Sequence, residues 1–220
     1  MTGIYLEIGK RRVFACAVEW PGWARLGRDQ DAALAALQAA APRYALVCGR
    51  AHVPFDASSA AARFEITERV PGSATTDFGA LDACADVDRA PLERPDAARL
   101  AALVAAAWTV FAEVAAAAPQ ALRKGPRGGG RDRDAISGHV LETEVLHAHM
   151  LGLRHRPFPA GDTSAAALLR ADILAAIRAG GASCLPPGEA RGRRPPRFVA
   201  RHTAWHALDH AWEIQDRQGA

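Results

Sequence analysis

The sequence predicts an α+β fold, in which a small ββαβ domain is followed by a four-helix bundle. Two observations support this prediction. β-Branched and aromatic residues concentrate in short runs before residue 75, and four segments after residue 93 repeat apolar residues at helical spacing. A chain of 220 residues, 50% of them hydrophobic, can bury one large core or two small ones. We therefore predict domains at residues 1–75 and 93–220, joined by a mixed, acidic linker over residues 76–92.

The first domain is predicted to contain two strands, a helix and a later strand. Residues 4–8 and 12–20 are rich in β-branched and aromatic side chains, and the loop between them is short enough for a hairpin. The sequence WPGW at residues 20–23 then breaks the strand. Residues 64–67 (FEIT) indicate the later strand. Between them, Asp29 or Asp31 can cap a helix whose apolar positions are Leu34, Leu37 and Ala41.

The second domain is predicted to contain four amphipathic helices with polar or Gly/Pro-rich connections, which favours a four-helix bundle. Pro95 suits the first turn of the first helix, and Pro119 ends it. The second helix starts at Asp132 or Asp134, the third at Asp162, Thr163 or Ser164, and the fourth runs from Pro195-Pro196 to near Gln218. The predicted core stripes are Leu100, Leu103, Ala107, Val110 and Val114 in the first helix, Ile136, Val140, Thr143, Leu146 and Met150 in the second, and Leu169, Ile173 and Ile177 in the third.

Charge, hydropathy and cysteine usage exclude several classes of function. The 27 basic and 24 acidic side chains leave a net charge of +3, too small for a protein that coats nucleic acid. The longest apolar run, residues 100–118, contains Glu113 and stops at a proline, so we expect a core helix and no membrane segment. The four cysteines, including Cys184 in a Gly/Pro loop, form no C-x-x-C pair. Because the first residues also lack a signal-peptide pattern, we expect a reduced, cytoplasmic protein.

A histidine-rich segment, RHTAWHALDHAWE at residues 201–213, is the strongest indication of chemistry. Histidines four residues apart lie one turn apart on one face of a helix, which allows two imidazoles to bind one divalent metal. Either His202 with His206 or His206 with His210 can form that pair. Because bundles build metal sites from facing helices, we expect a third ligand from another helix.

The second helix offers two candidates for that third ligand, His139 and His147, which both lie toward its apolar face. Eight residues of helix separate them by about 12 Å, so they cannot share one metal. In a simple up-down-up-down bundle the second and fourth helices run in the same direction, and matching their levels favours His147.

The segment HVLETE at residues 139–144, followed by the tryptophan-rich HALDH sequence at residues 206–210, resembles the DinB-like superfamily of metal-dependent four-helix proteins. The resemblance covers about residues 93–217. It implies one metal ligand from the second helix and an H-x-x-x-H pair from the last, which places the ligands at His139, His206 and His210. The sequence AWEI follows His210, where HRGQ is often found in the superfamily.

The same resemblance implies a metal-dependent thiol S-transferase or isomerase that acts on small electrophiles, since the superfamily includes thiol-dependent transferases and mycothiol-dependent maleylpyruvate isomerases. The expected cofactors are a divalent transition metal (zinc, nickel or iron) and a low-molecular-weight thiol. Three imidazoles with an open coordination position form a catalytic arrangement, in which the metal lowers the pKa of a bound thiol or water. Asp209 or Glu213, one helical step from the ligands, can orient an imidazole.

The front of the chain resembles a second family. Residues 3–70 are similar to the HicB-type ββαβ antitoxin-like module, through YLEI, RVFACAVEWPGW and RLGRDQDAALAAL. This resemblance implies a protein partner, and it leads to a competing hypothesis of a binding or regulatory protein with a non-catalytic bundle. No ribbon-helix-helix or helix-turn-helix sequence is attached to the module, which disfavours DNA binding. The sequence is also compatible with a homodimer.

Overall fold

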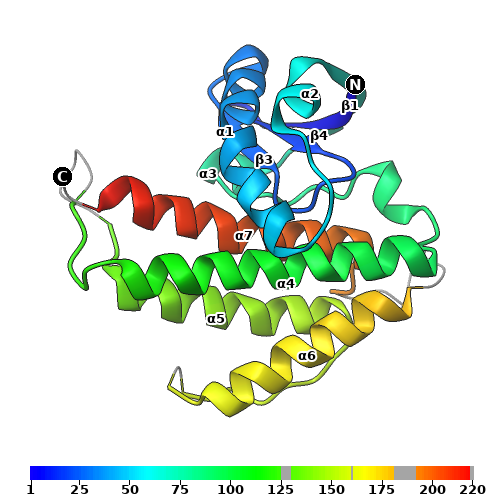
Figure 1. Ribbon diagram of the computed structural model, residues 1–220. Coiled ribbons are helices and arrows are strands. Elements are labelled where there is room, and N and C mark those ends of the chain that lie inside the picture. Colours follow the sequence, from blue (N-terminus) through cyan, green and yellow to red (C-terminus); the bar gives the residue numbers. More distant parts are fainter. Residues whose placement is uncertain (125–129, 160, 181–191, 219–220) are drawn as a thin grey trace.

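The computed structural model describes residues 1–124, 130–159, 161–180 and 192–218. These residues form a mixed α/β fold with one four-stranded sheet and seven α-helices (Figure 1). The strands are β1 (Thr2–Ile8), β2 (Val13–Ala17), β3 (Ala24–Gly27) and β4 (Phe64–Pro71). The helices are α1 (Gln30–Arg50), α2 (Ala57–Ala62), α3 (Ala74–Phe78), α4 (Arg94–Ala117), α5 (Arg133–Met150), α6 (Thr163–Ala179) and α7 (Pro196–Arg217). In Figure 1, α4 and α7 lie between the sheet with α1 and the pair α5 and α6.

The sheet has the strand order β3-β2-β1-β4, with β4 parallel to β1 and the other pairs antiparallel. The predicted ββαβ order was incomplete, because β3 and α2 were not foreseen. The second strand also ends at Ala17, before the predicted limit at Trp20, since the chain turns back over residues 18–23 to form β3. At Gly22 the backbone has a φ of +90°, and a Cβ atom would lie 2.6 Å from Leu208 Cδ1 of α7. The turn therefore packs directly on α7.

The side chain of Asp29 caps α1 by accepting a hydrogen bond from the backbone amide of Ala32 (2.8 Å). The buried face of α1 includes the predicted Leu37 and Ala41, and Trp23 donates a hydrogen bond from its indole Nε1 to the Leu37 carbonyl (2.8 Å). This bond satisfies a fully buried indole and holds α1 against the turn that precedes β3.

Contacts between helix ends determine the directions of α4, α5, α6 and α7. Arg197, near the start of α7, donates to Asp96, near the start of α4 (3.1 Å), so these two helices run in the same direction. The start of α7 also meets the end of α5, where the Arg194 amide donates to the Met150 carbonyl (2.8 Å). The end of α6 lies against the segment that leads into α4. Helices α5 and α6 therefore run antiparallel to α4 and α7, and the up-down-up-down order was wrong.

The buried face of α5 differs from the predicted stripe. Ile136 and Val140 are buried as predicted, but Leu146 is 56% exposed. Glu144 is buried instead, because Arg170 of α6 donates two hydrogen bonds to its carboxylate (2.8 and 2.9 Å). A pattern based on apolar residue types assigns a glutamate to the solvent side, and only the arginine on the neighbouring helix makes its burial possible. The stripe also included Thr143 and Met150, which are only partly buried.

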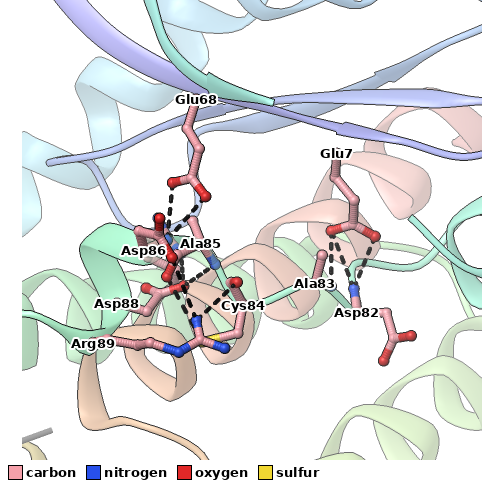
Figure 2. A network of polar contacts seen from close by, with 10 residues as sticks. Glu7, Glu68, Asp82, Ala83, Cys84, Ala85, Asp86, Asp88 and Arg89 are labelled. Atoms are coloured by element: carbon pink, nitrogen blue, oxygen red, sulfur yellow. Dashed lines mark hydrogen bonds and ion pairs between the residues drawn. The ribbon is translucent and has the colours of Figure 1, made fainter. Parts of the chain in front are cut away.

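The predicted linker is held against the sheet by carboxylates. The Glu7 carboxylate of β1 accepts hydrogen bonds from the backbone amides of Asp82 and Ala83, and Glu68 of β4 accepts from the amide of Asp86 (Figure 2). Within the same segment, a short 3₁₀ helix spans Asp86–Arg89.

The sheet and helices α4 to α7 share buried packing. One continuous cluster of buried side chains includes Leu6 of the sheet, Leu37 of α1, Leu103 of α4 and Leu208 of α7. Helix α4 is long and apolar enough to cross a membrane by length and composition, and 56% of its apolar window is buried inside the protein. The core helix of a soluble protein passes the same test, so this helix by itself is weak evidence of a membrane span.

Candidate metal centre

Three histidines predicted as metal ligands come together between α5 and α7. His206 and His210 lie one turn apart on α7, and His139 of α5 faces both of them, with ring centroids 5.0 and 5.1 Å away. One nitrogen from each ring lies within 4.8 Å of the other two. This is the arrangement in which three imidazoles can bind a single ion.

The separation of two of these nitrogens matches metal ligation. Nε2 of His139 and Nε2 of His206 are 3.3 Å apart. Two nitrogens bound to one tetrahedral zinc at about 2.0–2.1 Å lie about 3.3–3.4 Å from each other. The observed distance is slightly longer than the usual range of an N–H hydrogen bond, about 2.7–3.2 Å. The facing nitrogens therefore need little rearrangement to become ligands of one ion.

Burial keeps two of the imidazoles neutral. Burial, and after it the neighbouring His210, lower the pKa of His206 to about 2. Burial and the charge of His210 also lower the pKa of His139. A metal ligand needs a free nitrogen lone pair, which a protonated imidazole does not offer. At neutral pH both rings are therefore in the form that binds a metal.

Glu213 sets the proton position on the third ring. Nδ1 of His210 donates a hydrogen bond to Glu213 Oε2 (2.8 Å), and Arg217 donates to Oε1 of the same carboxylate (2.6 Å). The bond from His210 and then the one from Arg217 lower the pKa of Glu213, so the carboxylate accepts rather than donates. The lone pair of His210 is then on Nε2. Of the two predicted orienting residues, Asp209 instead accepts a hydrogen bond from Arg25 (3.1 Å).

A second histidine pair lies beside the centre. His202 bonds through Nε2 to the carbonyl of Leu81 (2.8 Å) and through Nδ1 to Nε2 of His147 (2.9 Å). Nδ1 of His147 bonds to the hydroxyl of Thr203 (3.0 Å). Because a carbonyl only accepts, His202 carries its proton on Nε2, His147 on Nε2, and the hydroxyl donates. Both rings are thereby satisfied as neutral groups, and burial lowers the pKa of both.

The antiparallel course of α5 and α7 explains which histidine joins the H-x-x-x-H pair. When two helices run in opposite directions, a residue early in one meets residues late in the other. His139 therefore meets His206 and His210, and His147 meets His202. The level-matching preference for His147 assumed parallel helices, and it was wrong for that reason. The repeat of histidines at 202, 206 and 210 was visible in the sequence. Helix geometry alone did not give their partners, and His139 was named only through the family resemblance.

No further histidine or cysteine of the described residues joins this group of three. His149 is exposed, and Nε2 of His155 pairs with Asp172 of α6 (3.1 Å). Burial raises the thiol pKa of Cys16 to about 12 and that of Cys84 to about 11, so neither thiol is a ready nucleophile at neutral pH. Cys48 is also buried, with a pKa raised to about 12. Cys184 lies outside the described residues.

Comparisons of the chain with protein-family models, with curated proteins and with solved structures found no match.

Proposed function

We propose that this protein is a DinB-like metal-dependent enzyme, which joins a low-molecular-weight thiol to a small electrophile or isomerises the adduct. The observation that carries the proposal is the convergence of three imidazole nitrogens on one point, at a spacing that suits a single ion. A set of three histidines leaves one coordination position open, as catalytic zinc sites do.

In this proposal α4 to α7 form the four-helix bundle of the DinB-like superfamily, and the sheet with α1 and α2 corresponds to the HicB-like module. The partners would be a small-molecule thiol and an electrophile, with a protein partner or a second copy of the chain at the first module. A reducing cytoplasm would keep the thiol available. The imidazole set suits zinc, nickel or iron.

His139, His206 and His210 would hold the ion. When bound, the ion would supply Lewis-acid chemistry that lowers the pKa of a coordinated thiol or water. Glu213 keeps the proton of His210 on Nδ1 and leaves Nε2 free for ligation. The low pKa of His206 prevents protonation from competing for that ligand. The chain thus contributes three imidazole ligands and the group that orients one of them.

The first test is the metal content of the full-length protein purified without added metal. We expect about one divalent transition ion per chain, lost in His206→Ala and His210→Ala. His149→Ala is the matched control, because His149 is an exposed histidine on α5. His202→Ala should also retain the ion, because this residue bonds to His147 instead. Retention of metal in His206→Ala would contradict the assignment of the centre.

The second test is thiol transfer to small electrophiles with mycothiol, bacillithiol and glutathione in turn. Activity with one of them that is lost in His206→Ala and kept in His149→Ala would support the proposed reaction. Metal binding without activity toward any thiol would favour the competing function, in which the first module engages a protein partner and the bundle is a scaffold.

A further inference from the structure

A pocket of about 250 Å³ lies on α5, the helix that also carries His139 of the candidate metal centre. It is lined by Gly138, Leu141, Glu142 and Val145 of α5 and by Pro157 and Phe158 of the segment that follows the helix. Gly138 precedes His139, and Glu142 lies one helical turn beyond it, close enough for its charge to act on the imidazole. The pocket therefore begins within one helical turn of a predicted metal ligand.

Gly138 opens this pocket. It lies inside α5, and its φ is not in the positive region, so the backbone conformation there does not require glycine. A Cβ atom at this position would meet no atom of the described residues within 4 Å, so packing does not require glycine either. Glycine inside a helix is unfavourable relative to alanine. The absence of a side chain at Gly138 instead leaves the space of the pocket free above the helix.

The lining determines the chemistry of the occupant. Leu141, Val145 and Phe158 are partly buried and pack against the main core, so the wall they form is apolar and supported from behind. The charged lining group is the exposed carboxylate of Glu142, which disfavours an anionic ligand. The volume exceeds that of an apolar cavity of about 150 Å³, which can hold benzene. A single uncharged ring or a short branched alkyl group fits these limits.

We propose that this pocket receives the uncharged apolar group of the substrate, while the reacting atom lies at the three histidines. The placement of the reacting atom rests on the proposed function. The inference assigns the substrate class: small electrophiles or thiols that carry one aromatic ring or a short alkyl group, and no negative charge next to it.

The first experiment tests the pocket without the metal. Indole is titrated into the chelator-treated, full-length protein, and binding is followed by ligand-observed NMR. We expect wild type to bind and Gly138→Leu to weaken binding at least about tenfold, because the new side chain fills the space. Gly138→Ala should weaken it less and raise the melting temperature. The matched control is Gly49→Leu, at a helical glycine whose Cβ would also meet nothing within 4 Å.

The result that would overturn the pocket is wild-type affinity for indole in Gly138→Leu, or an equal loss in Gly49→Leu. Should the leucine variant fail to fold, Gly138→Ala decides the same question, since wild-type affinity in that variant removes the predicted role of the space.

The second experiment tests whether the pocket and the candidate metal centre bind two parts of the same ligand. Benzyl mercaptan and 2-mercaptoethanol are compared on the cobalt-loaded protein by the thiolate-to-cobalt absorption band. We expect benzyl mercaptan to bind at least about tenfold tighter, with the advantage lost in Gly138→Leu. Equal affinity of the two thiols would overturn the inference. Absence of the band with both thiols, while indole binding still depends on Gly138, would instead refute the proposed thiol chemistry and leave the pocket as a binding site.

Discussion

Replacing His139 by alanine should empty the candidate metal centre, whereas replacing His147 should leave it filled. Both histidines belong to α5, but only His139 presents Nε2 to the α7 pair, at 3.3 Å from His206. His147 uses both ring nitrogens in hydrogen bonds to other groups. A lone pair that already accepts from Thr203 is not available to a metal.

The expected losses of metal affinity and of folding stability differ between the two variants. Structural zinc sites with four ligands bind with about 10–16 kcal/mol, or about 3 kcal/mol for each ligand. Since 1.4 kcal/mol corresponds to a tenfold change, His139→Ala should weaken metal binding by about 100-fold or more. His147→Ala removes a side chain that is 1% exposed and leaves two hydrogen-bonding groups unpaired. It should therefore cost about 2–5 kcal/mol of folding stability, while metal affinity changes by less than about tenfold.

The assay is a zinc competition titration against a chromophoric chelator, paired with urea unfolding of the metal-free proteins. His149→Ala serves as control for the loss of an α5 imidazole, because this side chain is exposed. The reasoning is refuted if His147→Ala loses metal as strongly as His139→Ala, or if the two variants differ only in stability.

Three further predictions follow from the geometry. Glu213→Gln removes the carboxylate that holds a ligand ring, so metal affinity should fall about 10–100-fold in the same titration, and an unchanged affinity would contradict this role. Burial lowers the pKa of His147 and His202 below 6.5, so the metal-free protein should lose stability as pH falls below 6.5, by about 2.7 kcal/mol per pH unit at most from this pair. Urea unfolding at a series of pH values would show this, with a smaller slope in His147→Gln. Asp88→Ala leaves the buried guanidinium of Arg201 unpaired and should cost about 3–5 kcal/mol in urea unfolding, whereas Arg28→Ala, which breaks the exposed pair with Asp29, should have little effect.

Local signals in the sequence predicted where some helices begin and which side chains share a helix face. Asp29 and Asp162 cap α1 and α6 as two of the predicted alternatives, because a short carboxylate can bond to the free amides of the first turn. The stripe of Leu169, Ile173 and Ile177 is buried in α6. The H-x-x-x-H spacing placed His206 and His210 on one face of α7, since that spacing depends only on the helical repeat.

The order of apolar and polar residues on a single segment does not report the identity of the element beside it. The strand β3 has only four residues and was not predicted, because a strand this short is defined mainly by its pairing with β2. Glu144 was not part of the predicted core stripe of α5, because its burial depends on Arg170, 26 residues away.

The sequence by itself determined which side chains share a face on each helix, because the periodicity of a helix is a local property. Only the tertiary structure decided which faces meet. Helix α6 runs in the same direction as α5 rather than back along it, so α7, which follows α6, runs antiparallel to α5 (Figure 1). That direction brings His139 to the α7 pair and sends His147 to His202, and it depends on long-range packing that no single segment encodes.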